Sequence, residues 1–359
     1  MKPFSAGYYI KNNKGRSAIV IFMMFLTVCM FLAGNYLGSL WWYYEEAEKL
    51  DQQIVTVGAI TTDTDYADWK SFTEDLKSDT QLIAFGRTGR ANGSMLDANT
   101  TIGLDVGTGS YVFNSAEDLQ RAFNLLKIDF DCSGLSDMDM VMSENFAKNI
   151  SFKIGDVTPD RQFTLRGTFP GDSYVSFRIY TEPEENYYRY NLMSETLRGD
   201  ALREHVRELI GDRKINIERQ MVHQAYEEME PVKAIFYAGL IILSVILAVT
   251  LNSVVTGQYV KREYEFGVYR ALGIPKGRIR RKVAAELALM DVIALAAGIA
   301  VILLFSFLMN ELYYIPRGKF LPYRTKMGVE GLALSNLVVL LPMIYMKGRR
   351  MSRMDVTEF

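Results

Sequence analysis

The chain has 359 residues, of which 49% are hydrophobic and 23% charged, and its formal net charge is -2. These averages conceal a strong segregation, because the apolar residues form a few long runs while most of the charge lies between Glu45 and Lys233. A single globular core would distribute both kinds of residue, so the pattern argues against an ordinary soluble domain and indicates a membrane protein with one polar domain.

The two cysteines, Cys29 and Cys132, predict neither a disulfide framework nor a zinc site, because one lies inside the first apolar run and the other in the polar block. Cys29 follows Leu26-Thr27-Val28, a weak match to a lipoprotein cleavage site. Val28 is unfavourable there and the apolar run continues past it, so we expect no lipid attachment.

The apolar runs predict four membrane-spanning helices, each of which needs about 20 apolar residues to cross a hydrocarbon core of about 30 Å. No charged residue lies between Arg16 and Glu45, and the aromatic residues 41–44 close this run as an interfacial belt. A cleaved signal peptide would have a shorter apolar core. The predicted fold is therefore an integral membrane α-helical protein with four transmembrane helices and an α+β extracytoplasmic domain inserted between helices 1 and 2.

The predicted boundaries follow from these runs. They are 1–16 for the cytoplasmic N-terminus, 17–44 for helix 1, 45–232 for the extracytoplasmic domain with its membrane-proximal stalk, 233–260 for helix 2, 261–282 for a cytoplasmic loop, 283–309 for helix 3, 310–326 for an external loop, 327–346 for helix 4 and 347–359 for the cytoplasmic tail.

Lysine and arginine predict the orientation in the membrane. They concentrate before helix 1, in the loop 261–282 and after residue 346. Four crossings place all three segments on one side, and the excess of positive charge marks that side as the cytoplasm. We expect a multi-pass protein of the bacterial plasma membrane with both termini cytoplasmic.

The polar block is acidic, which argues against a nucleic-acid partner. Its sequence pattern predicts both strands and helices. Strands are predicted at 54–57, 81–85, 162–167 and 174–180, and helices at 66–76, 115–126 and 200–210. Ser115 is the predicted N-cap of the second of these helices, because Glu117 and Asp118 follow it in the first turn.

No active site is predicted in this block. The glycine-rich segment 86–93 lacks the Gly-Lys-Ser/Thr ending and the following helix of a phosphate-binding loop. The only histidines, His205 and His223, are expected to be solvated, and no serine nucleophile motif or metal-spaced cluster accompanies them. We therefore predict no catalytic residue, no metal ligand and no cofactor-binding residue, and we expect no enzymatic activity from this chain.

The two segments that flank the outer domain in the sequence predict a membrane-proximal stalk. Helix 1 can continue outward to Leu50, and an apolar residue recurs every fourth position before helix 2, interrupted by Pro231. The stripe residues are Ile217, Met221, Ala225 and Met229. The alternative is an ordinary surface helix of the domain.

The loop 261–282 carries more than topology-setting charge. Phe266, Val268, Tyr269 and Leu272 need a surface to bury against, either the membrane interface or another protein. The basic residues 278–282 are expected only to fix the topology.

This loop also carries a family resemblance. Glu265-Phe266-Gly267-Val268-Tyr269-Arg270-Ala271-Leu272-Gly273, followed by Ile279 and Glu286, resembles a segment of the FtsX-like permeases, the membrane subunits of MacB-type ABC transporters. Gly298 stands where that family usually has a small residue, and Ser143-Glu144-Asn145-Phe146-Ala147-Lys148 with Gly155-Asp156 resembles a segment of its outer domain. The tail 349–359 also resembles the family's ending.

The resemblance implies a permease subunit whose cytoplasmic loop docks on a separate ABC ATPase. The residues that it assigns to this coupling are Glu265, Phe266, Gly267, Tyr269, Arg270, Ala271, Leu272, Gly273 and Glu286. No Gly-x-x-x-x-Gly-Lys-Ser/Thr occurs in the chain and only about 16 residues precede helix 1, so ATP is expected to bind the partner ATPase alone. Because four helices do not readily enclose a pore, a second permease subunit, identical or not, is also expected.

The leading hypothesis is a mechanical one, in which ATP-driven motion of the loop passes through the stalk to the outer domain. Few polar residues interrupt the spans, mainly Asn35, Thr250, Asn252 and Asp291, which argues against a hydrated path. Asp291 is expected to pair with a nearby arginine or lysine. A membrane-anchored sensor that signals through a cytoplasmic partner is the alternative; a secondary transporter would show internal repeats.

Overall fold

The computed structural model describes residues 6–60, 65–88, 96–106, 108–159, 162–181, 187–218 and 229–353. The chain forms two compact units. Unit 1 comprises Met1–Ser39, Pro231–Met309 and Leu321–Phe359, and unit 2 comprises Leu40–Glu230 and Asn310–Phe320. We describe each unit by itself.

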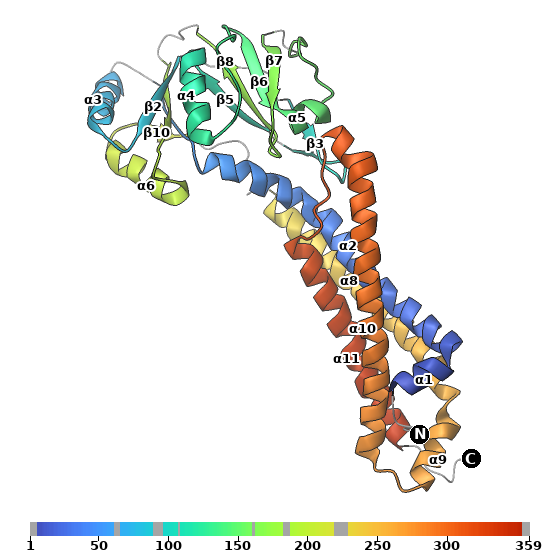
Figure 1. Ribbon diagram of the computed structural model, residues 1–359. Helices are drawn as coiled ribbons and strands as arrows, with labels where there is room; N and C mark the ends of the chain where they lie inside the picture. The colour runs from blue at the N-terminus through green and yellow to red at the C-terminus, as the bar shows by residue number, and fades with distance from the viewer. Residues whose placement is uncertain are drawn as a thin grey trace. The chain divides into compact units, whose positions relative to one another are not determined.

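Unit 1 is built from helices (Figure 1). They are α1 (Ala6–Asn12), the first part of α2 (Lys14–Asp51), α8 (Glu230–Val260), α9 (Glu263–Ala271), α10 (Lys276–Met309) and α11 (Lys326–Arg353). Among the described residues, four helices are long and apolar enough to cross a membrane, the number that the sequence predicts. They are α2, α8, α10 with the turns that follow it, and α11.

The helix α10 extends beyond its predicted span at the basic end of unit 1. The helix α10 starts at Lys276 instead of Val283, because lysine and arginine, which make up most of residues 276–282, are good helix formers that need not enter the apolar layer. The expected loop 261–282 also contains the short helix α9. Pro231 lies in the first turn of α8, where its missing N–H costs no intrahelical hydrogen bond.

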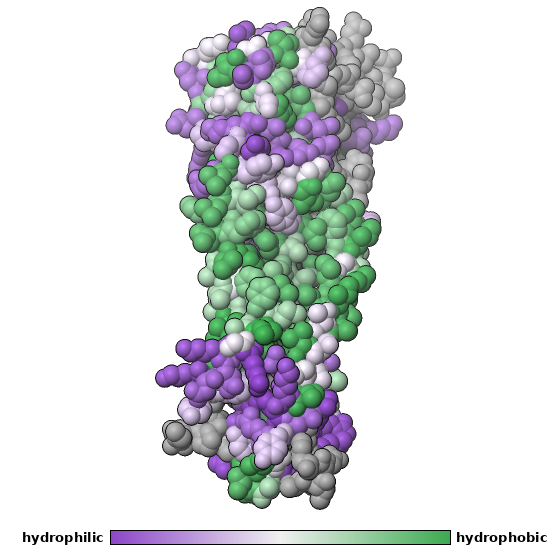
Figure 2. Space-filling view, turned by 90° about the vertical axis from the view of Figure 1, so that its right-hand side faces the viewer, coloured by the Kyte–Doolittle hydropathy of each residue, from purple (hydrophilic) through white to green (hydrophobic). Residues whose placement is uncertain are grey.

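The core of unit 1 joins side chains from all of the spanning helices. Val20 and Met24 of α2 and Val255 of α8 belong to one buried apolar cluster with residues of α9, α10 and α11. Many other apolar side chains of α8 and α10 face outward, Ile242 and Leu304 among them. On the face drawn in Figure 2 such side chains form a broad apolar band, bounded by polar side chains at the end where α10 begins.

The helices α2 and α11 cross at a pair of glycines. A Cβ atom added to Gly34 would lie only 2.6 Å from the Cα of Gly328. Beside this crossing the buried Asn35 donates to the Tyr323 carbonyl oxygen at 3.0 Å and accepts from the Thr325 amide at 2.9 Å. The side-chain amide of Asn35, a polar residue of α2, therefore has hydrogen-bond partners in the residues just before α11.

Unit 2 contains two four-stranded sheets and one two-stranded sheet among the strands that the structure describes. The first sheet has the order β10-β1-β9-β2 and is antiparallel throughout. The second has the order β5-β8-β6-β7, in which β5 and β8, like β6 and β7, run parallel, while β6 and β8 run antiparallel. The strands are β1 (Val55–Ile60), β2 (Ile83–Thr88), β3 (Ala98–Asn99), β4 (Asp105–Val106), β5 (Gly109–Phe113), β6 (Asp139–Ser143), β7 (Thr164–Phe169), β8 (Val175–Ile179), β9 (Tyr187–Met193) and β10 (Asn216–Ile217).

Each large sheet has its own helices and its own apolar core. The helices α3 (Asp65–Ser78) and α6 (Gly199–Ile210) pack on the first sheet through residues such as Phe72 and Val206. The helix α4 (Ala116–Leu126) packs on the second through Phe123, and α5 (Glu144–Asn149) follows β6. The buried Asn191 joins the two sheets, because its Nδ2 donates to the Val112 carbonyl oxygen at 2.8 Å. This is the predicted α+β domain.

Capping explains where two of these helices begin. The hydroxyl of Ser115 accepts from the Asp118 amide at 3.1 Å, which confirms the predicted N-cap of α4. Ser143 caps α5 in the same way, accepting from the Phe146 amide at 3.3 Å. The serine of the family-like segment 143–148 therefore has a structural role.

The segment after α10 is part of unit 2 and not a plain connecting loop. It forms a π-helical turn, η1 (Asn310–Tyr314), and a 3-10 turn, η2 (Ile315–Arg317). Tyr174 donates to the Gly318 carbonyl oxygen at 2.8 Å, and a Cβ atom at Gly318 would overlap the carbonyl oxygen of Asn145. The end of the α10 segment is thus fixed against α5.

The predicted stalk stripe differs from the structure where the structure describes it. Ile217 lies on β10, paired with Val57, because the edge of the first sheet offers its backbone partners there. Met229 lies in a turn before α8. Met221 and Ala225 lie outside the described residues, as does most of the glycine-rich segment 86–93.

The first histidine also differs from expectation. His205 is half-buried on α6, with its Nε2 2.8 Å from the Asp79 carboxylate, and so it links α6 to the end of α3. His223 lies outside the described residues.

Candidate functional site: an ion-pair cluster beneath α9

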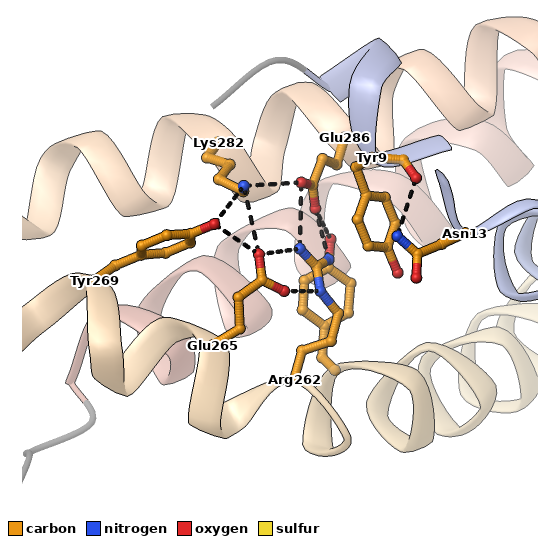
Figure 3. Close-up of polar contacts among 8 residues, drawn as sticks. Tyr9, Asn13, Arg262, Glu265, Tyr269, Lys282 and Glu286 are labelled. Atoms are coloured by element: carbon orange, nitrogen blue, oxygen red, sulfur yellow. Dashed lines mark hydrogen bonds and ion pairs between the residues drawn. The ribbon is translucent and has the colours of Figure 1, made fainter. Parts of the chain in front are cut away.

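The short helix α9 is joined to its neighbours by Arg262, a buried arginine that stands at its N-terminus. The Arg262 side chain is 3% exposed. Its Nη1 donates to Glu286 of α10 at 2.7 Å, and its Nε donates to Glu265 of α9 at 2.9 Å (Figure 3). One guanidinium group therefore binds carboxylates from two helices.

A lysine and two tyrosines complete the cluster. Lys282 Nζ lies 3.5 Å from Glu265 Oε1 and 3.7 Å from Glu286 Oε1. Tyr269 donates to Glu265 at 3.0 Å, and Tyr259, at the end of α8, donates to Glu286 at 3.3 Å. Two cations and two carboxylates thus form a closed, neutral network among α8, α9 and α10. We call Arg262, Glu265, Lys282, Glu286, Tyr259 and Tyr269 the ion-pair cluster.

Aromatic rings enclose the central arginine. The guanidinium carbon of Arg262 lies 3.8 Å from the ring centroid of Tyr9, 4.9 Å from that of Phe266 and 5.2 Å from that of Tyr259. Such contacts stabilise a cation that is removed from water. Since Tyr9 belongs to α1, the cluster also holds the N-terminal helix.

The electrostatics suit a structural ion pair. Burial opposes ionisation of Glu265, but hydrogen bonds and charge from Arg262 and Lys282 outweigh it and hold the pKa of that carboxyl below its usual value. Burial opposes the charge on Arg262 as well, yet the two glutamates raise its pKa. Burial and the neighbouring Glu265 raise the pKa of Tyr269 to about 12. None of these three groups changes protonation near neutral pH, so they hold helices together rather than transfer protons.

The opposite side of α9 is apolar and exposed. Tyr264, Val268 and Leu272 are 71%, 39% and 73% exposed. Residues four apart lie on one face of a helix, so these side chains form a single stripe. In Figure 2 apolar side chains appear again beyond the polar side chains at this end of unit 1. We call Tyr264, Val268 and Leu272 the α9 stripe.

The predicted coupling residues divide between these two sides. Glu265, Tyr269 and Glu286 meet in the cluster, and Phe266 and Gly267 are buried next to it. Ala271, Leu272 and Gly273 are exposed, and Gly273 has a φ of +80°. Arg270 is half-buried, and its Nη1 donates to the Ile274 carbonyl oxygen at 3.4 Å.

Comparison with known proteins identifies the part of the chain that contains this site. Residues 235–346 match the family model described as FtsX-like permease C-terminal. This segment is an FtsX-like permease domain. The resemblance stated for residues 265–273 is thereby confirmed, and both the ion-pair cluster and the α9 stripe lie inside the matched range.

Among solved structures, the chain is similar to the periplasmic region of MacB from Actinobacillus actinomycetemcomitans. The two are 12% identical, the alignment covers 52% of this chain and 98% of that chain, and the TM-score is 0.25. No curated protein sequence matches the chain.

Four members of the site were not predicted: Tyr9, Tyr259, Arg262 and Lys282. The spacing of Lys282 and Glu286, four apart on one helix, and of Arg262 and Glu265, three apart, was a usable signal for ion pairs. Lys282 was expected only to fix topology, but its side chain is 3% exposed. Nothing in the sequence places Tyr9 over Arg262, because that contact depends on how α1 folds back.

Asp291 has a different partner from the one expected. Asn336 of α11 donates to both of its carboxylate oxygens, at 3.1 and 3.0 Å. The expected arginine or lysine is replaced by an amide, which satisfies the carboxylate without a second charge in the apolar layer. Within the described residues, no group of three or more His, Cys, Asp or Glu side chains is arranged to hold a metal ion.

Proposed function

We propose that this chain is the permease subunit of an ABC transporter and that the α9 stripe is its contact with a separate ATPase. The observation that carries the proposal is the two-sided construction of α9. Its inner side is held by the buried Arg262–Glu286 pair, and its outer side presents Tyr264, Val268 and Leu272. An exposed apolar stripe in a short segment between two spanning helices is typical of a protein-binding surface.

The ion-pair cluster would make α9 a stiff connection. Any tilt of α9 away from α10 separates Arg262 from Glu286, and breaking a buried ion pair from one side costs about 3–5 kcal/mol. A push on the stripe is therefore expected to displace α8, α9 and α10 together instead of bending the connection. We infer that ATP binding and hydrolysis in the partner move these helices as one body.

The outer domain would receive this motion through the far end of the α10 segment. Gly318 and Phe320 belong to unit 2, where Tyr174 binds the Gly318 carbonyl oxygen and Trp42 packs on Phe320 at 5.3 Å. If this segment shifts, the residues of unit 2 that contact it are expected to shift with it. This favours transmission of force to an extracytoplasmic domain, in efflux or in the activation of an external partner.

The arrangement of unit 1 supports the proposed orientation. The helix α1, the helix α9 and the end of α11 meet at one end of unit 1, where Arg350 pairs with Glu263 at 2.8 Å (Figure 1). These are the three basic segments of the sequence. We propose that this end is cytoplasmic, with both termini there, and that two permease subunits assemble in the bacterial plasma membrane.

Co-purification tests the proposal. The tagged full-length chain is purified from its native membrane in mild detergent, with and without gentle cross-linking, and the eluate is assayed for ATPase activity and for associated proteins. We expect an ABC ATPase in stoichiometric amount with the wild type, and loss of at least about 90% of it with Tyr264→Ala/Val268→Ser/Leu272→Ser, since truncating a central apolar contact of an interface commonly costs more than 1 kcal/mol.

The matched control is Tyr66→Ala/Ile154→Ser/Val157→Ser, which removes three similarly exposed apolar side chains from unit 2. This variant should keep the ATPase. A wild type without any ATPase after cross-linking refutes the proposal and favours a sensor. Equal retention of the ATPase by both variants shows that the α9 stripe is not the contact.

A further inference from the structure

A cavity of about 500 Å³ lies between the start of α10 and the end of α11. Arg280 and Arg281 line it from α10, and Arg349 and Arg353 line it from α11. Ile344 and Tyr345 are among its apolar walls. It is separate from the ion-pair cluster, with which it shares no lining residue.

The charge of this cavity is unbalanced. Among the described residues, four arginines and no carboxylate line it, and no carboxylate forms an ion pair with any of the four. The neighbouring Arg350, by contrast, pairs with Glu263 at 2.8 Å. Four like charges around one space repel one another, so a bound anion would stabilise the arrangement.

Two of the arginines are held in place. Arg280 Nε donates to Ser352 Oγ at 3.0 Å, and Arg349 Nη1 donates to the Tyr345 hydroxyl at 3.3 Å. An alanine at Gly348 would meet the Arg280 side chain at 3.7 Å, so the helices approach closely there. Planar guanidinium groups fixed in this way suit bidentate binding of phosphate oxygens.

The apolar walls select the class of anion. Ile344 and Tyr345 continue along α11 into the part of the helix that is apolar enough to cross a membrane, and Tyr345 is 65% exposed. Arginines and apolar side chains of a helix that could span a membrane therefore line the same cavity. A ligand with a phosphate group and an attached hydrocarbon chain can contact both the arginines and the apolar walls, whereas a soluble phosphate contacts only the arginines.

We propose that this cavity binds the headgroup of an anionic phospholipid, with the phosphate among Arg280, Arg281, Arg349 and Arg353 and the acyl chains along α10 and α11. The bound lipid joins the start of α10 to the last turns of α11. This role does not depend on an ATPase partner.

Native mass spectrometry and thermal unfolding of the full-length chain in detergent test the proposal. The probes are phosphatidylglycerol, phosphatidylcholine and inorganic phosphate. The variant is Arg281→Gln/Arg349→Gln/Arg353→Gln. The matched control is Lys261→Gln/Lys276→Gln/Arg278→Gln, which removes the same charge from exposed positions at the same end of unit 1.

We expect the wild type and the control to retain phosphatidylglycerol and to gain thermal stability from it. The variant should bind it at least about tenfold more weakly, because each arginine near an anionic headgroup contributes about 1 kcal/mol. Phosphatidylcholine should have little effect. Equal stabilisation by inorganic phosphate shows a simple anion site, and equal losses in variant and control show general surface electrostatics; either result overturns the proposal.

A single change keeps the test decisive if the triple variant does not fold. Arg353→Gln alters the last described residue of α11 and should weaken phosphatidylglycerol binding several-fold, with an unchanged gel-filtration profile. Binding equal to that of the wild type in this variant and in Arg281→Gln would also refute the site.

Discussion

Arg262 Nη1 and Glu286 Oε2 lie 2.7 Å apart in unit 1, and neither side chain is more than 3% exposed. A charge pair at this depth is expensive to break from one side only, because the remaining charge stays buried. The pair also joins Arg262, which directly precedes α9, to Glu286 of α10, and so links the two sides of the short segment that contains α9.

The first prediction concerns this pair. Glu286→Ala should lower the free energy of unfolding by about 3–5 kcal/mol, while Arg262→Met/Glu286→Leu, which removes both charges, should cost much less than the sum of its single changes. Unfolding in detergent, followed by tryptophan fluorescence, measures both. The control is Glu263→Ala, which breaks the exposed pair with Arg350 and should cost no more than about 1 kcal/mol. Equal losses for Glu263→Ala and Glu286→Ala would contradict the buried pair.

The second prediction concerns the glycine crossing of α2 and α11. Gly34→Ala and Gly328→Ala should each destabilise the protein by about 1–3 kcal/mol, because the added methyl group meets the backbone or side chain of the other helix. Thermal unfolding in the same detergent measures the change. Gly239→Ala and Gly257→Ala of α8, where an added Cβ meets nothing within 4 Å, are the matched controls and should be neutral or slightly stabilising. A neutral Gly34→Ala would show that the helices do not cross there.

The third prediction concerns Cys132, which is fully buried in the core beneath α4. Burial, with a smaller effect from Asp131, raises the pKa of its thiol to about 11. Since the thiolate is the reactive form, Cys132 in a Cys29→Ser background should react with maleimide only after denaturation. Labelling followed by mass spectrometry reports this. Moving the thiol to the exposed neighbouring position, with Cys132→Ser/Ser133→Cys, should give rapid labelling of the folded protein. Rapid labelling of native Cys132 would place it outside the core.

The fourth prediction concerns the pH dependence of unit 2. Burial raises the pKa of Asp139, but hydrogen bonds from Arg166 and Ser136 and the charge of Arg166 outweigh it, so the pKa lies below its usual value. A lowered carboxyl pKa stabilises the folded state above about pH 4, and this contribution is lost as the pH falls through the lowered value.

Asp139→Asn should therefore unfold more easily than the wild type at pH 7, by about 1–3 kcal/mol, and the difference should shrink as the pH falls below about 4. Unfolding curves at several pH values measure it. The exposed Asp129→Asn serves as the control and should show no such trend. A difference that stays constant with pH would mean that the carboxylate charge is not the cause.

Periodicity and composition predicted the parts of the fold that depend on local sequence. The number of spanning helices followed from the apolar runs, and the N-cap of α4 followed from Ser115 and its acidic first turn. The strands β5, β6 and β9 were not predicted. Both β5 and β6 are buried on both faces or nearly so, and they therefore lack the alternation of apolar and polar residues that marks a half-buried strand. The apolar spacing at Ile217 predicted a helix, but pairing with β1 decided otherwise.

The candidate site was predicted only in part for a related reason. A single sequence shows that Phe266 and Leu272 are both apolar, but it does not show which of them faces inward. The structure separates them, with Phe266 fully buried and Leu272 73% exposed. The partners of Glu286 come from α8, from the connection between α8 and α9, and from α10 itself, so the cluster could be recognised only once these helices were placed side by side.

The contact between Asn35 and Thr325 joins residues 290 positions apart in the chain. A ribosome adds about 5–20 residues per second, so the first spanning helix waits about 15–60 seconds for the segment that satisfies its buried amide. During synthesis that helix carries a polar side chain in lipid, or against the insertion machinery, before its final neighbour exists. The order of translation therefore makes α11 the element that completes unit 1, and truncation before residue 325 leaves the earliest helix without its partner.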